Sequence, residues 1–167
     1  MLIYDYCNST IRARGFQYYK AKRIRNVEKV SDSKFTGLVD GNSTYHVTLD
    51  LNDYNKCHCD CLYKRKICKH IVALYFEVNK QEADSYEMFI KSLIEEKIAY
   101  DNKKQEEYLI EYNRVKEYVE SLSNEERKQE LITRILIDHR DSSYSRYDER
   151  YEEEFEILDE IDWELLK

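Results

Sequence analysis

The sequence contains no proline, and its longest uninterrupted apolar run is the six residues from Ile71 to Phe76. A helix that crosses a bilayer needs about 20 predominantly apolar residues, so we expect no membrane span. A secretory signal begins with a basic stretch followed by an apolar one. The first residues here contain the acidic Asp5 and no such basic stretch. We therefore expect neither a signal peptide nor a membrane anchor, and we predict a cytoplasmic protein.

Apolar residues other than tyrosine are also scarce. The chain of 167 residues is 42% apolar only because 16 Tyr are counted, and 37% of its residues are charged. Its mean hydropathy is −0.81. This length allows one domain, or a small domain with an extension, around a lean core. The sequence lacks the G-x-x-x-x-G-K-[ST] phosphate loop, which excludes an ATPase motor of that class.

The cysteines are few and clustered. Four of the five lie between Cys57 and Cys68, whereas Cys7 stands alone. An odd, clustered set in a chain without an export signal favours a metal site over disulfides. Alternate residues of an extended segment point to one side, so two ligand pairs remain open: Cys57 with Cys59, or Cys59 with Cys61. Either pair, joined by Cys68 and His70, gives zinc four donors and no open position. We therefore expect a structural ion and no enzymatic activity.

The segment Cys59-x-Cys61-x6-Cys68-x-His70 resembles the SWIM zinc finger, C-x-C-xn-C-x-H, of bacterial Swi/Snf-type helicases, transposases and several eukaryotic proteins. The resemblance extends over residues 9 to 78, and includes Arg14-Gly15 followed by Tyr18-Tyr19. It implies that zinc is held by Cys59, Cys61, Cys68 and His70. Leu62-Tyr63 departs from the Pro-Tyr pair that often follows the first two ligands in this family.

The order of patterns around the cysteines predicts an α+β fold, with a small N-terminal helix, a β-hairpin, a zinc-binding ββα-like finger and a helical C-terminal extension. We place a zinc-finger domain at residues 1–80 and an acidic helical region at 81–167. The predicted elements of the first domain are a helix capped by Ser9 or Thr10 and running towards Ile24, strands at 27–30, 35–39 and 45–51, a turn at 40–42 and a helix that starts near Cys68.

Beyond residue 80, apolar residues recur at helical spacing. The predicted elements are a helix from Ala83 to about Ala99 with a capping box of Asp84 and Glu87, a polar interruption from Asp101 to Glu107, a coiled-coil-like seam from Tyr108 to Leu122, a capping box of Ser123 and Glu126, a loop from Asp141 to Arg150 and an acidic helix from Tyr151 to Leu166.

Charge divides the chain. Residues 1–80 contain 14 Lys and Arg against 8 Asp and Glu, a net charge of +6, whereas residues 81–167 contain 13 against 26, a net charge of −13. Basic residues bind phosphates and tyrosine rings stack on unpaired bases, so we predict binding of nucleic acid, DNA rather than RNA, or of a protein in a nucleic-acid-processing complex. The candidate basic residues are Arg12, Arg14, Lys64, Arg65, Lys66 and Lys69, and the candidate stacking residues are Tyr18, Tyr19, Tyr45 and Tyr63.

Two alternatives remain open. In the first, the protein is an interaction adaptor: zinc is purely structural, and the acidic helices dock a partner through apolar residues such as Trp163. In the second, it is a factor of a mobile element or phage that acts on the DNA machinery of a host.

Overall fold

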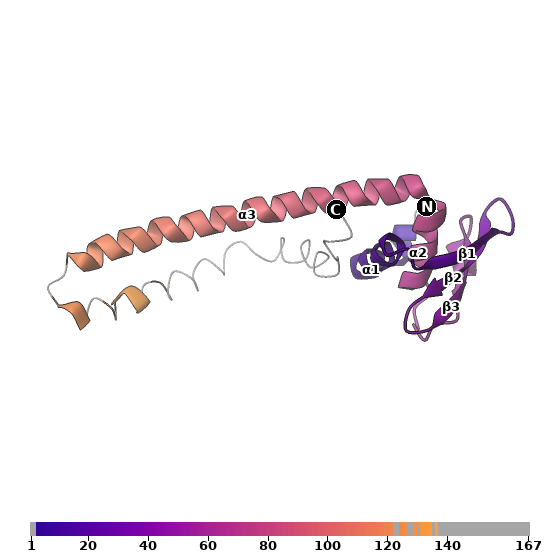
Figure 1. Ribbon diagram of the computed structural model, residues 1–167, viewed down its shortest axis with the longest axis horizontal. Coiled ribbons are helices and arrows are strands. Elements are labelled where there is room, and N and C mark those ends of the chain that lie inside the picture. The colour runs from indigo at the N-terminus through magenta and orange to yellow at the C-terminus, as the bar shows by residue number, and fades with distance from the viewer. Residues whose placement is uncertain (1–2, 122–123, 127–128, 130, 135, 137–167) are drawn as a thin grey trace. The chain divides into compact units, whose positions relative to one another are not determined.

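The computed structural model describes residues 3–121, 124–126, 129, 131–134 and 136; those up to Lys91 lie in one compact unit, and those from Ser92 onward lie in a second. The α+β class predicted from the sequence is confirmed (Figure 1). In chain order the elements are η1 (Ile3–Tyr6), α1 (Ser9–Lys20), β1 (Ile24–Lys29), β2 (Lys34–Asp40), β3 (Thr44–Asp50), η2 (Tyr54–Lys56), β4 (His58–Cys59), α2 (Lys69–Val78) and α3 (Lys80–Glu120).

Among the described residues, no helix combines the length and apolar character that a membrane span requires. The predicted cap at Ser123, the loop from Asp141 to Arg150 and the helix from Tyr151 to Leu166 lie outside the described residues.

The four strands form one antiparallel sheet in the order β1-β2-β3-β4. The first three correspond to the predicted strands, although β1 begins three residues earlier, and β4 adds a fourth strand beside β3. Val39, Val47 and Leu49 alternate along β2 and β3 and are buried on the same face. The helix α2 packs against this face. Its Leu74 lies so close to Gly37 that a Cβ added at Gly37 would be 3.2 Å from Cδ1 of Leu74. His46, on the opposite face, is exposed. The sheet therefore has a covered face that holds the core and a face that meets solvent.

Both ends of α1 differ from the prediction. The helix is capped by Asn8, whose side-chain oxygen accepts a hydrogen bond from the Ile11 amide at 2.9 Å, so the predicted cap at Ser9 or Thr10 is wrong. It ends at Lys20 and does not continue towards Ile24, which pairs with Val39 as the first residue of β1. The chain turns there because Lys22 adopts a left-handed conformation with a φ of 53°, which ends a right-handed helix.

A close approach at Gly15 joins α1 to α2. A Cβ added at Gly15 would lie 2.5 Å from the Cβ and Cγ1 atoms of Val72, so only glycine allows these helices to pack at this distance. Next to it, Phe16 meets Phe76 of α2 and Tyr86 of α3 with ring centroids 5.3 and 5.0 Å apart. Aromatic rings from three helices thus form the centre of the core beside the sheet.

The third helix is continuous where the sequence predicted an interruption. The polar run from Asp101 to Glu107 lies inside α3, and the predicted capping box of Asp84 and Glu87 is wrong because the helix begins at Lys80. Ion pairs four residues apart, such as Lys97 with Asp101 at 2.9 Å, stabilise a polar stretch as helix. Glu87 instead binds Lys20 of α1 at 2.8 Å.

We expect the substitution Gly15→Ala to destabilise the zinc-loaded protein. Alanine favours helix by about 1 kcal/mol over glycine, but the added methyl group would overlap Val72, and overpacking of a core costs about 1–3 kcal/mol. The free energy of unfolding, measured by urea denaturation, should therefore fall. Ser9→Ala, at an exposed position of the same helix, is the control and should change it little. A gain in stability for Gly15→Ala would contradict the close packing of α1 on α2.

Candidate metal centre

Three cysteines and one histidine converge between the sheet and α2. One ligand atom from each of Cys59, Cys61, Cys68 and His70 lies within 4.8 Å of the others. The Nδ1 atom of His70 is 3.6 Å from the sulfur of Cys59 and 3.8 Å from that of Cys68. Donors placed tetrahedrally around zinc, at about 2.0–2.3 Å from the ion, lie about 3.5 Å from one another. The spacing and chemistry of this group therefore fit a zinc ion.

Secondary structure places each donor. Cys59 pairs with Val47 in the register of β3 and β4, which turns its side chain to the face covered by α2, whereas the neighbouring His58 pairs with Thr48. Cys61 follows in the turn after β4. Cys68 is the N-terminal cap of α2, and His70 lies in its first turn. The two ligand pairs thus come from a strand end and a helix start that face each other.

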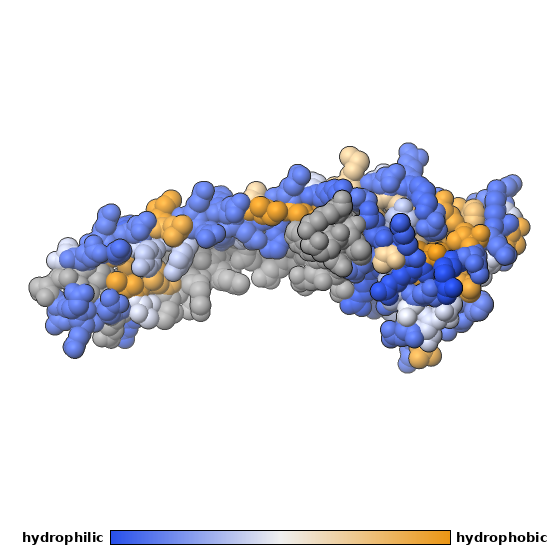
Figure 2. Space-filling view, in the orientation of Figure 1, coloured by the Kyte–Doolittle hydropathy of each residue, from blue (hydrophilic) through white to orange (hydrophobic). Residues whose placement is uncertain are grey.

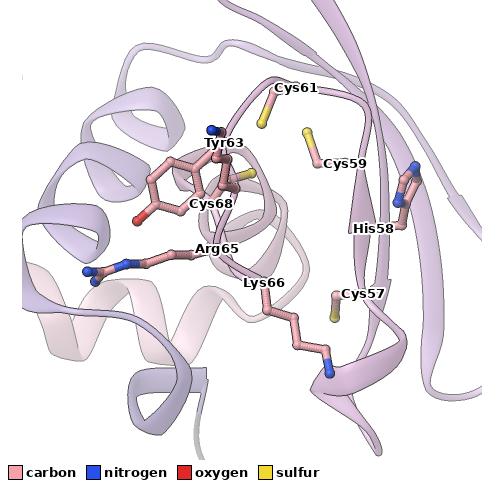
Figure 3. A pocket seen from close by; sticks show the side chains of 9 residues that line it. Cys57, His58, Cys59, Cys61, Tyr63, Arg65, Lys66 and Cys68 are labelled. Atoms are coloured by element: carbon pink, nitrogen blue, oxygen red, sulfur yellow. The ribbon is translucent and has the colours of Figure 1, made fainter.

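The structure separates Cys57 from the donors. Its buried sulfur accepts a hydrogen bond from the Asp50 amide at 3.4 Å and is 3.8 Å from the Asp50 carbonyl oxygen. Figure 3 shows Cys57 apart from the neighbouring side chains of Cys59 and Cys61. Of the two ligand pairs that the spacing left open, the structure therefore brings Cys59 and Cys61 to Cys68 and His70. The carboxylate of Asp60, between the ligands, accepts from the His46 amide at 3.0 Å.

Two tyrosine rings hold the imidazole of His70. Tyr45 of β3 stacks on it at a centroid distance of 4.3 Å and an angle of 21°, and Tyr18 of α1 approaches edge-on at 5.4 Å. The Nδ1 atom faces the sulfur atoms, while the buried Nε2 atom has no hydrogen-bond partner among the described residues. A metal-binding histidine usually donates its second N–H to a carboxylate, a carbonyl oxygen or water. Here aromatic packing orients the ring instead.

Gly41, in the turn between β2 and β3, leaves room for this arrangement. A Cβ at this position would lie 3.0 Å from Cε2 of Tyr45 and 3.3 Å from both Nε2 of His70 and the hydroxyl oxygen of Tyr18. The turn itself is confirmed as predicted from Asp40-Gly41-Asn42. Its contact with the metal ligand was missed, because the sequence marks Gly41 only as a turn residue.

The sulfur atoms differ strongly in acidity. The pKa of Cys68 is lowered to about 4, mainly because the Cys59 thiol donates a hydrogen bond to its sulfur. Burial opposes this shift, while His70 and the backbone N–H of Ile71 at the start of α2 add to it. The same hydrogen bond, together with burial, raises the pKa of Cys59. Zinc replaces the protons of the thiols that it binds, so loading of the site releases protons.

Three of the predicted nucleic-acid-binding residues share one cavity with the metal cluster. Lys64, Arg65 and Lys66 line a cavity of about 350 Å³ beside Cys59, Cys61 and Cys68. Figure 3 shows Arg65 and Lys66 together with these cysteines. The Lys66 ammonium donates a hydrogen bond to the side-chain oxygen of Asn55. Neither Lys64 nor Arg65 has an ion-pair partner within the described part of the chain.

The other three predicted basic residues lie elsewhere. The Lys69 ammonium is 4.6 Å from the ring centroid of Tyr18. Arg14 is exposed on α1. Arg12 is half-buried, with its guanidinium carbon 5.9 Å from the ring centroid of Tyr86.

The four tyrosines predicted to stack on bases also have different surroundings. Tyr18 and Tyr45 pack on His70, and Tyr19 packs on Phe76 with a centroid distance of 6.2 Å. Tyr63 is 39% exposed and lines the cavity beside the metal cluster. The sequence did not reveal the first three contacts, because α1, β3 and α2 meet only in the folded chain.

Comparison with known proteins identifies the family of this segment. Residues 45–79, which run from β3 to the end of α2 and contain all four donors, match the family model of the SWIM zinc finger. No curated protein and no solved structure gives a significant match. The family match and the Cys3His cluster agree on the ligand pattern and on zinc as the metal.

We expect Cys61→Ser to prevent tight zinc binding at one ion per chain, and Cys57→Ser to leave it intact. If the binding free energy of a structural zinc, about 10–16 kcal/mol, is divided evenly among four ligands, one thiolate contributes about 3 kcal/mol, or roughly a 100-fold change in affinity. Competition with a chromophoric chelator measures this affinity. The opposite result for the two variants would assign the ion to Cys57 and Cys59.

We also expect Gly41→Ala to weaken zinc binding although it changes no ligand. The added methyl group would press on Tyr45 and His70 and turn the imidazole away from the sulfur atoms. Loss of a group that orients a metal ligand costs about 10–100-fold in affinity, and we expect the lower end of that range. The same chelator competition measures it. Ser43→Ala, exposed in the same turn, is the control; equal affinities for both variants would show that the turn does not position His70.

Proposed function

Because residues 45–79 form a SWIM zinc finger, we propose that zinc fixes the shape of a surface that binds nucleic acid, DNA in preference to RNA. The strongest support is the loop that joins the two ligand pairs. It carries three consecutive cations, Lys64, Arg65 and Lys66, and all three side chains are exposed. Within the described part of the chain, neither Lys64 nor Arg65 pairs with a carboxylate, and such cations bind phosphates. Zinc ligands at both ends of the loop limit its motion.

The charge of the N-terminal half supports the same function. It carries 14 basic and 8 acidic residues, and three thiolates with one zinc ion remove only one positive charge from that excess of six. A second cationic group lies near the metal: the guanidinium carbon of Arg23 is 4.7 Å from the ring centroid of Tyr18, which Lys69 also contacts. A positive surface of this kind attracts phosphate-rich partners before specific contacts form.

The zinc ion in this proposal has no catalytic role. Catalytic zinc sites usually combine three protein ligands with a water molecule at an open position. Four donors here converge on one point, and three of them are thiolates. The proposed function is therefore that of a binding protein, with zinc as a structural ion.

Exposed apolar residues on α3 favour a second candidate function, an adaptor that docks a protein partner. Figure 2 shows hydrophobic side chains in separate patches between hydrophilic ones along this helix. Met88 is 73% exposed and Ile110 is 69% exposed. Binding through such residues would persist at high salt, whereas phosphate binding would weaken. The dependence on salt therefore separates the two functions.

We expect Lys64→Ala combined with Arg65→Ala to reduce both the affinity for DNA and its salt dependence. Each phosphate contact to a single strand contributes about 0.7 to the slope of log K against log salt, so the slope should fall by about 1.4. Fluorescence anisotropy of a labelled oligonucleotide at several salt concentrations measures both quantities.

The control is Lys29→Ala combined with Lys34→Ala, which removes the same charge from the β1–β2 hairpin. Equal losses in the two double variants would mean that overall charge alone binds DNA. If the zinc-loaded protein bound no nucleic acid at low salt, the proposed function would be refuted.

A further inference from the structure

The helix beside the zinc ion cannot enter a groove of double-stranded DNA. All residues from His70 to Phe76 in α2 are buried. The sheet packs on one side of this helix, α1 packs on another, and Tyr86 of α3 contacts Phe76 at a centroid distance of 5.4 Å. A helix reads the major groove only when one of its faces is free to lie against base edges. This zinc finger therefore has no recognition helix at the position where many zinc fingers carry one.

The other helices do not replace it. In α1 only Ser9 and Arg14 are exposed, and the remaining residues are buried or half-buried. The helix α3 contains 7 basic and 11 acidic residues, so its net charge of −4 would repel a phosphate backbone. Within the described residues, the cations near the metal are thus those of the loop that lines the cavity, together with Arg23 and Lys69 beside Tyr18.

The cavity beside the zinc cluster has a polar lining, and the zinc ligands Cys59, Cys61 and Cys68 form part of its wall. Its volume of about 350 Å³ lies near the lower end of the range of about 300–1,000 Å³ that small-ligand sites occupy. A double helix, whose major groove alone is about 12 Å wide, is too large to enter a cavity of this volume. A single unpaired nucleotide that projects from a strand is of the matching scale.

The side chains around the cavity supply the two interactions that a nucleotide needs. The ring of Tyr63 is partly exposed and offers a face for a base, while Lys64 and Arg65 offer charges for the flanking phosphates. Figure 3 shows the Tyr63 ring and the Arg65 side chain on the same side of the loop. An aromatic ring next to cations is the combination by which proteins bind single strands without strong sequence preference.

We propose that this cavity binds one unpaired nucleotide, so that the protein prefers single-stranded to double-stranded nucleic acid. The base stacks on Tyr63, and the adjacent phosphates pair with Lys64 and Arg65. This inference rests on the proposed function and assigns it a substrate class. Zinc contributes by fixing both ends of the six-residue loop between Cys61 and Cys68 that carries these side chains.

Anisotropy titrations of the full-length, zinc-loaded protein test this inference. The probes are a labelled 12-nucleotide thymidine strand, the same strand paired with its complement, and a uridine strand of equal length. We expect the single DNA strand to bind at least tenfold more tightly than the duplex. Tyr63→Ala should weaken binding of the single strand about tenfold, in line with the loss of one stacked base. Tyr63→Phe, which keeps the ring, should bind as the unsubstituted protein does.

Tyr118→Ala, which removes a ring that is 58% exposed on α3, is the matched control and should bind normally. Zinc content and circular dichroism verify that each variant is folded. A thymidine strand with one 5-iodouracil should crosslink to Tyr63 under ultraviolet light, as mapped by mass spectrometry.

Three results would overturn the inference. Equal affinity for duplex and single strand, with Tyr63→Ala unchanged, would overturn the nucleotide cavity but leave nucleic-acid binding in place. Binding of neither DNA form nor the uridine strand would overturn the proposed function together with the cavity. Crosslinking only to residues outside the loop would place the strand elsewhere. Tighter binding of the uridine strand, with the same loss in Tyr63→Ala, would support the cavity and assign it to RNA.

Discussion

Coordination of one zinc ion is the interaction on which the N-terminal half depends, because it joins parts of the chain that have few other reasons to meet. Cys59 and Cys61 come from the end of the sheet, and Cys68 and His70 come from the start of α2. The free energy of structural zinc binding, about 10–16 kcal/mol, is as large as the total stability of a small domain, about 5–15 kcal/mol. With so few apolar residues outside tyrosine, this chain relies on metal coordination where a larger domain relies on its core.

The aromatic residues extend the effect of the metal into the rest of the fold. Tyr45 and Tyr18 hold the imidazole of His70 from β3 and α1, and Gly41 leaves the space that the rings need. Thus α1, β3 and the turn between β2 and β3 each contribute a residue that positions His70. Two of the four tyrosines predicted to stack on bases, Tyr18 and Tyr45, thus belong to the shell around His70.

The sequence predicted the elements that follow from local patterns and missed those that depend on contacts between distant residues. The spacing of cysteines and histidine located the ligand cluster, but it allowed Cys57 as well as Cys61, and only the hydrogen bonds between Cys57 and Asp50 separate them. The run from Asp101 to Glu107 predicted an interruption because it lacks an apolar side. A helix that is surrounded by water and stabilised by ion pairs does not need an apolar side. The end of α1 depends on the left-handed backbone of Lys22, which apolar periodicity does not reveal.

The burial of α2 on several sides has a consequence for what counts as the smallest folding unit. The segment from 45 to 79 that matches the family contains the metal ligands but only part of the core, since Phe16 and Tyr86, which lie against Phe76, come from outside it. Excised as a peptide, this segment would expose the apolar surface of its helix to water even with zinc bound. Unlike small zinc fingers that work as interchangeable modules in tandem arrays, this one is inseparable from its flanking helices. A fragment meant to fold on its own must therefore include α1 and the start of α3 as well as the segment that holds the metal.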